Sequence, residues 1–171
     1  MAYGKRHLQH VMGALAGLLI LTSTGTAQAQ EFVATFGNWS VFTITQNTEK
    51  VCYIASAPVK EAGNYSKRGK PYALVTHRTA TIDEVSVSSG YPYQADSKVK
   101  VEVDSKKSEF FTKGEIAWAY DQKQDADVVS AMKRGNRMTV RGTSPRGTYS
   151  IDTYSLKGIT AAYNKMKSLC R

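Results

Sequence analysis

His77 is the only histidine outside the first 29 residues, so it is the only imidazole that could serve acid–base chemistry in a mature protein. A serine nucleophile needs a base and an orienting acid; His77 could be the base, and Asp83 or Glu84 the acid. Three serines follow on the same segment, namely Ser86, Ser88 and Ser89. No G-x-S-x-G segment presents any of them as a nucleophile. We therefore expect no enzymatic activity and a His77 hydrogen-bonded locally at a strand end; a hydrolase that uses His77 is the alternative.

The sequence has no recognisable motif for binding a metal ion or a cofactor. A zinc site normally takes three or four His, Cys or carboxylate ligands, and the two cysteines suit a disulfide instead. Glycine-rich phosphate loops do not occur after the leader. Carboxylates for glycoside hydrolysis could be drawn from Asp121, Asp125, Asp127 and Asp152, but the first three suit a polar turn and a helix start. We expect no cofactor and no metal.

Arginines and hydroxyl groups gather between residues 137 and 148, where Arg-Gly-Thr stands on both sides of Ser-Pro. One interpretation is a β-turn, in which serine, proline and glycine occupy the first, second and fourth positions. The other is a site for phosphate or carboxylate, because guanidinium groups suit bidentate contact with these anions. The candidate anion-binding residues are Arg137, Arg141, Thr143, Ser144 and Arg146.

A second segment, from Tyr65 to Tyr72, interleaves aromatic residues with Lys67, Arg68 and Lys70. Such interleaving is typical of surfaces that bind nucleic acid or glycan. Because an exported protein seldom meets nucleic acid, we expect a solvated loop here and no nucleic-acid partner.

The N-terminus has the three parts of a secretory signal peptide. Lys5 and Arg6 precede an apolar run from Val11 to Leu21, and Ala-Gln-Ala29 provides a cleavage site. This run is about half of the ~20 residues that a helix needs to cross a bilayer. We predict a signal peptide over residues 1–29, a single mature domain over residues 30–171, and a periplasmic or outer-membrane-associated location.

The mature chain is basic and has two cysteines. Removal of Lys5 and Arg6 lowers the formal charge from +9 to +7, which favours anionic neighbours such as lipid headgroups or glycans. Export brings Cys52 and Cys170 into an oxidising compartment. We therefore predict that they form one disulfide, which closes nearly the whole domain into a loop.

Short strands at fairly even spacing must position these residues. The run Lys98–Val103 is the clearest, because its three valines point to one face and its charged residues to the other. Similar runs are 39–44, 51–55, 72–77, 82–88, 109–111, 116–120, 138–142 and 149–156, with a loop over 60–70. They predict a mainly β domain, a single antiparallel β-sandwich or curled barrel, with a hairpin at residues 138–156.

Two short helices interrupt the strands. The first is expected to begin at Asp125 or Asp127 and to end at Gly135, which suits a left-handed C-cap. The second, from Ile159 to Leu169 near the C-terminus, repeats apolar residues at three- and four-residue spacing, with Thr160 as its expected N-cap.

Several segments occur in a characteristic order along the mature chain: Trp39, Cys52–Ala55, Pro71–Arg78, Gly90–Tyr93, Phe110–Thr112, Ala117–Ala119, Gly142–Ser144, Arg146–Thr148, Asp152–Leu156 and Cys170. In these segments the chain resembles the invasion-associated locus B family of small exported proteins of Gram-negative bacteria. The resemblance implies a β-rich periplasmic or outer-envelope protein, named for a locus linked to host-cell invasion, with no established enzymatic activity. It supplies no catalytic residues. Pro145 departs from the family pattern and stiffens the turn.

Three functions are open: an envelope interaction module, a structural envelope component and a hydrolase. We favour the first, with an envelope or host component as partner, anionic lipid or glycan as candidate ligands, and peripheral membrane contact. A hydrolase would hold His77 at the floor of a polar pocket. A structural component would instead show an extensive apolar or self-complementary surface patch.

Overall fold

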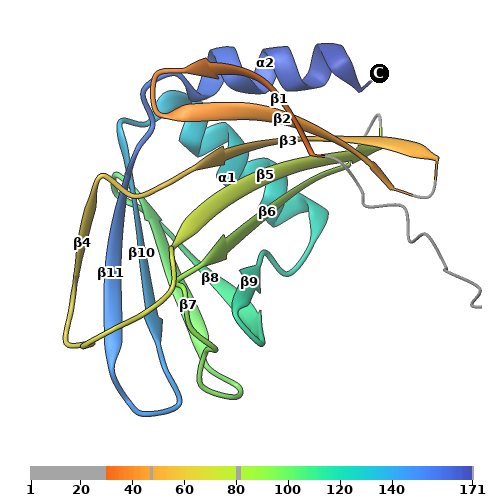
Figure 1. Ribbon diagram of the computed structural model, residues 1–171. Helices are drawn as coiled ribbons and strands as arrows, with labels where there is room; N and C mark the ends of the chain where they lie inside the picture. The colour runs from red at the N-terminus through yellow and green to blue at the C-terminus, as the bar shows by residue number, and fades with distance from the viewer. Residues whose placement is uncertain (1–29, 47, 80–81, 171) are drawn as a thin grey trace, which may run out of the picture.

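The computed structural model describes residues 30–46, 48–79 and 82–170 (Figure 1). The strands are β1 (Glu31–Phe36), β2 (Trp39–Gln46), β3 (Glu49–Ser56), β4 (Lys60–Gly63), β5 (Tyr72–Thr79), β6 (Ile82–Ser88), β7 (Lys98–Val103), β8 (Lys106–Lys113), β9 (Ile116–Trp118), β10 (Arg137–Thr143) and β11 (Tyr149–Ser155). The helices are α1 (Gln122–Arg134) and α2 (Ile159–Leu169). The predicted signal peptide, residues 1–29, lies outside the described residues.

All eleven described strands belong to one open sheet, in the order β1-β2-β3-β5-β6-β9-β8-β7-β10-β11-β4. Every neighbouring pair is antiparallel. The sheet bends strongly, so that β2, β3, β5 and β6 run across the direction of β11, β10 and β7 (Figure 1). The prediction of a mainly β, antiparallel fold with two helices, one of them at the C-terminus, is confirmed.

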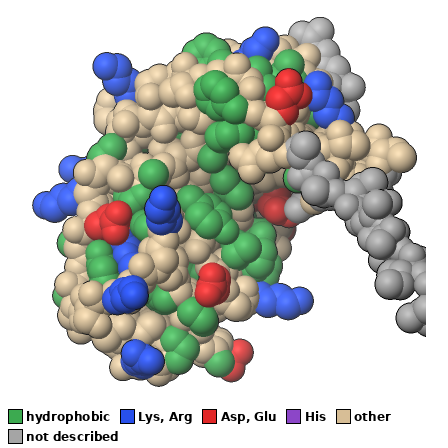
Figure 2. Space-filling model, viewed as in Figure 1, with side chains coloured by type: hydrophobic (Ala, Val, Ile, Leu, Met, Phe, Trp, Pro, Cys, Tyr) green, Lys and Arg blue, Asp and Glu red, His purple; other side chains and the backbone are tan. Residues whose placement is uncertain are grey.

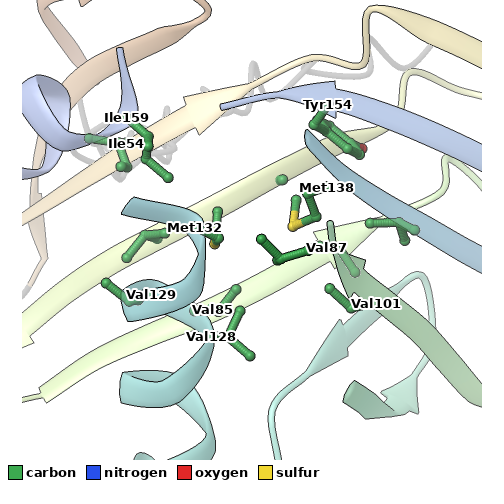
Figure 3. Packing of buried hydrophobic residues seen from close by; sticks show 14 of the residues in the cluster. Ile54, Val85, Val87, Val101, Val128, Val129, Met132, Met138, Tyr154 and Ile159 are labelled. Atoms are coloured by element: carbon green, nitrogen blue, oxygen red, sulfur yellow. The ribbon is translucent and has the colours of Figure 1, made fainter. Parts of the chain in front are cut away.

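The core lies on one side of this sheet, which we call the inner face. Alternate residues of neighbouring strands reach it, as the pattern of Lys98–Val103 predicted. Figure 3 shows Ile54 and Val87 of the sheet packed with Met132 of α1 and Met138 of β10. Helix α2 adds Met166 to the same cluster. Both helices therefore cover the inner face, and the opposite side of the sheet is the outer face.

The predicted hairpin is confirmed. Strands β10 and β11 pair from Arg137 opposite Ser155 to Thr143 opposite Tyr149. The connecting turn closes with a hydrogen bond in which the Gly147 amide donates to the Ser144 carbonyl at 2.9 Å.

The helix caps differ from the predictions. Asp121 caps α1, and its carboxylate accepts from the Gln124 amide at 2.7 Å. Asp125 and Asp127 lie inside the helix, and the backbone of Gly135 has φ −89°, outside the left-handed region. Gly158, with φ +92°, occupies the N-cap position of α2 in place of Thr160. Polar residues are frequent near both helix starts, so residue type alone does not select one of them.

The predicted disulfide is present and joins strand β3 to the C-terminal end of the domain. Cys52 of β3 and Cys170, just after α2, are 118 residues apart, with Cα atoms 6.0 Å from each other. Closing a loop of this length stabilises a fold by ~4 to 5 kcal/mol in the chain-entropy model. Among the described helices, neither is long and apolar enough to cross a membrane.

Candidate functional site

A cavity of about 370 Å³ opens where three connections meet at one end of the β10–β11 hairpin. We call it the basic cleft. The loop before β5 supplies Tyr65, Lys67 and Arg68, the segment after β6 supplies Tyr91, and the β10–β11 turn supplies Arg146. No carboxylate is among its described lining residues.

Arg68 fixes one wall of the basic cleft. Its side chain is only 3% exposed, and it donates to both carboxylate oxygens of Asp152, at 2.5 and 2.8 Å. It also donates to Glu61 at 2.6 Å and to the Ser89 carbonyl at 3.0 Å. Burial by itself would lower the pKa of Arg68, but the hydrogen bonds with Asp152 and Glu61 outweigh it and raise the pKa. Arg68 is therefore a permanently charged anchor whose charge the two carboxylates balance.

Two glycines hold the loops of the basic cleft together. The Gly69 amide donates to the Gly90 carbonyl at 2.8 Å. Gly90 has φ +74°, and a Cβ there would lie 2.3 Å from the Gly69 carbonyl oxygen. Only glycine fits this position, so the approach of the two loops is built into the sequence.

The opposite wall is the predicted β-turn. The Ser144 amide donates to the Thr148 carbonyl at 2.8 Å, and the two hydroxyls lie 2.6 Å apart. The Arg146 amide donates to the Ser144 hydroxyl at 3.3 Å. These bonds fix the backbone of the turn, while the Arg146 side chain stays exposed and makes no ion pair with a described residue.

The five candidate anion-binding residues are divided by the fold. Ser144 and Arg146 line the basic cleft. Arg141 lies on the outer face, with its guanidinium 4.1 Å from the ring centre of Tyr149. Arg137 stands at the far end of β10, and Thr143 pairs with Tyr149 just before the turn; neither lines the cleft.

The fold brings together two segments that are far apart in the sequence. Lys67 and Arg68 were expected in a solvated loop, yet they face the same cavity as Arg146. The interleaved basic and aromatic residues were the signal for this wall. The sequence does not show that these residues lie beside the β10–β11 turn, because that proximity depends on long-range contacts such as the pairing of β4 with β11.

His77 lies away from the basic cleft, under helix α2. It is 1% exposed, and its Nδ1 is 2.8 Å from the Asp83 carboxylate. Tyr163 donates to the same carboxylate at 2.6 Å, and Lys167 lies 3.6 Å from it. Burial raises the pKa of Tyr163, and the bond to Asp83 raises it further.

The serines near His77 do not form a nucleophile with it. Ser86 and Ser88 alternate with Val85 and Val87 and point to the outer face, away from Asp83. The Ser89 hydroxyl instead accepts from the Tyr93 hydroxyl at 3.0 Å. His77 thus has an orienting acid but no described serine partner.

Comparison with known proteins supports the resemblance seen in the sequence. The family model described as "Invasion associated locus B (IalB) protein" matches residues 39–167. The crystal structure of invasion associated protein B from Bartonella henselae superimposes with a TM-score of 0.57 at 19% sequence identity. The superposition covers 80% of this chain and 95% of that one, and at this identity it shows a shared fold. A search of curated proteins finds no significant match. The matched family model spans most of the described domain, and the chain belongs to the invasion associated locus B family.

Proposed function

We propose that this protein is an exported, non-catalytic binding protein of the bacterial envelope, and that it holds an anionic group of an envelope or host component in the basic cleft. One observation carries the proposal. Lys67 and Arg146 line one cavity from two different loops, and neither makes an ion pair with a described residue. Unpaired cations held on a rigid frame suit phosphate or carboxylate.

The frame explains why the cleft can bind without rearranging. Arg68 is tied to Asp152 and Glu61, so it supports the loop rather than competing for the ligand. The guanidinium carbon of Arg68 lies 4.4 Å from the ring centre of Tyr65. The Tyr91 hydroxyl is 2.8 Å from the Ser150 hydroxyl. Aromatic walls beside cations also suit the apolar faces of sugar rings.

Export and location belong to the same proposal. The family is named for association with invasion, which fits a role at the contact between bacterium and host cell. Protein recovered from the envelope fraction should begin at Gln30, as N-terminal sequencing would show. A chain that still begins at Met1 would contradict cleavage at this site.

The cleft is tested by calorimetric titration of the mature protein. One arm uses a heparin oligosaccharide as a soluble anionic glycan, and the other uses vesicles that contain phosphatidylglycerol. The double variant Lys67→Ala, Arg146→Ala should weaken binding in at least one arm about tenfold, which corresponds to ~1.4 kcal/mol.

The matched control removes the same charge elsewhere. Lys157 and Lys165 lie outside the cleft, and the double variant Lys157→Ala, Lys165→Ala should change the affinity by about twofold or less. Equal losses from the two pairs would mean that net charge alone attracts the ligand, and the cleft would then be rejected as the site.

A further inference from the structure

The outer face of β2, β3 and β5 breaks the usual pattern of a sheet with one wet side. In an antiparallel sheet with its core on one face, residues that point to solvent are expected to be polar. Here the outward positions hold Phe42, Ile44, Tyr53, Tyr72 and Leu74. They line an open trough of about 460 Å³.

The apolar side chains continue across the bend of the sheet. Leu74 pairs with Ser86, Ser86 with Trp118, and Trp118 with Phe111, so these four residues form one row on the outer face. The rings of Phe111 and Trp118 stack with centres 5.6 Å apart. At the other end Phe32 lies 5.7 Å from Phe42, whose ring stacks on Tyr53 at 5.3 Å. We call this set the outer aromatic face: Phe32, Phe42, Tyr53, Tyr72, Phe111 and Trp118.

No described element covers the outer aromatic face. Helices α1 and α2 pack on the inner side, and α1 passes behind β3 and β5 in the view of Figure 1. Phe32 is 59% exposed and Phe111 37% exposed. Figure 2 shows hydrophobic side chains in a stripe down the middle of this view, with lysines and arginines on several sides of it and acidic side chains among them.

Basic residues border the same face on the neighbouring strands. Lys98 stands opposite Phe111, and Lys113 stands opposite Ile116 beside Trp118. Lys100 pairs with Arg141 one strand further on. Glu109 balances Lys98 at 3.1 Å, whereas Lys100, Lys113 and Arg141 make no ion pair with a described residue.

We propose that the outer aromatic face rests on the surface of an anionic phospholipid bilayer, and this rests on the proposed export to the envelope. Tryptophan and tyrosine rings favour the headgroup level, where one end of the side chain is apolar and the other is hydrated. The bordering lysines and arginine meet lipid phosphates, each attracted within about a Debye length of the membrane. A second copy as occupant would bring together two mature chains of formal charge +7, which repel.

Trp118 provides a direct measurement. The chain has two tryptophans, and Trp39 is fully buried with its indole N–H donating to the Ser155 carbonyl at 3.0 Å. Trp118 is partly exposed, so changes in emission report on the outer aromatic face. On mixing mature protein with vesicles of phosphatidylglycerol and phosphatidylcholine, the emission should shift to the blue, and brominated acyl chains should quench it.

Two exposed rings at opposite ends of the face can be removed without opening the core. The double variant Phe32→Ser, Phe111→Ser should bind these vesicles about tenfold more weakly, because burial of each ring contributes to the membrane contact. The control Val59→Ser removes an apolar side chain that is 57% exposed but stands near β11, away from this face. It should bind as the unchanged protein does, and melting curves should show that both variants remain folded.

The proposal for the basic cleft and the proposal for the outer aromatic face can be disproved independently. Vesicle binding that survives Phe32→Ser, Phe111→Ser but is lost in Lys67→Ala, Arg146→Ala would overturn membrane docking by the face and leave the cleft as a headgroup site. If the emission of Trp118 shifted to the blue with rising protein concentration in the absence of vesicles, membrane docking would be overturned in favour of a second copy as the occupant of the outer aromatic face. Loss of glycan binding in the cleft variant, with vesicle binding unchanged, would support both proposals.

Discussion

Arg68 and Asp152 form a two-point ion pair between positions 84 residues apart, and the Asp152 side chain is fully buried. The pair joins the loop before β5 to strand β11, so it fixes the wall of the basic cleft to the sheet. We expect Asp152→Asn to destabilise the fold by ~3 to 5 kcal/mol, because it leaves the guanidinium charge poorly balanced in a buried site. Denaturant unfolding would measure this. The double variant Arg68→Met, Asp152→Leu should be less destabilised than Asp152→Asn, and the opposite order would contradict the role given to the pair.

The disulfide between Cys52 and Cys170 gives the second prediction. Cys52→Ser should lower the free energy of unfolding by up to ~4 to 5 kcal/mol, since the unfolded chain loses the cross-link between Cys52 and Cys170. Thermal unfolding with and without reductant gives the comparison. Alkylation without reductant should modify no cysteine, and labelling of Cys52 and Cys170 in periplasmic protein would refute the bond in the cell.

Asp125 predicts a dependence of stability on pH. Burial in the first turn of α1 raises its pKa from 3.8 to about 6, although the Val85 amide donates to it. Glu84 and Asp121 raise the pKa further. The folded state then holds a proton between pH 4 and 6 that the unfolded state has lost. This contribution to stability is full below pH 3.8 and is lost as the pH rises through about 6.

Asp125→Asn isolates that contribution, because the amide oxygen can still accept from Val85. The melting temperature of the variant, relative to the unchanged protein, should rise between pH 4 and pH 7. A constant difference across this range would show that the pKa of Asp125 is not raised.

Substitution of His77 distinguishes the proposed binding function from the hydrolase alternative. His77→Ala should lower the melting temperature, because it opens a cavity and removes one of the partners of the Asp83 carboxylate. Glycan binding in the basic cleft and any envelope phenotype of a gene deletion should persist. Loss of that phenotype, in a variant that is folded and exported at normal level, would favour the enzyme.

Alternation and turn chemistry were sufficient to predict most of the strands, but not their order in the sheet. The valines of Lys98–Val103 and the Ser144–Gly147 turn appear where their residue types require. Strands β1 and β4, at the two edges of the sheet, were not predicted. All four residues of β4 are exposed, so no alternation marks that strand. The outer aromatic face is also visible in part in the sequence, since the outward positions of Trp39–Ile44 and Tyr72–His77 include Phe42, Ile44, Tyr72 and Leu74.

The candidate site was predicted in part. Arg146 and Ser144 were identified from a local pattern, and both line the cleft. Arg141 was grouped with them because it stands just across the turn, but a strand sends alternate residues to opposite faces, and Arg141 points outward. Lys67 joins the site through long-range contacts of its loop, among them the pairing of β4 with β11 and the Arg68–Asp152 ion pair, which local patterns do not encode.

Arg141 and Arg146 therefore provide the sharpest test of the cleft. They share one hairpin and carry the same charge, but Arg146 lines the cleft and Arg141 packs on Tyr149 across from Lys100. Arg146→Ala should weaken binding of the heparin oligosaccharide about tenfold, and Arg141→Ala by about twofold or less. Titrations at low and physiological salt should show a larger difference at low salt, where charges are less screened. Equal effects of the two substitutions would mean that the hairpin attracts anions only through its total charge.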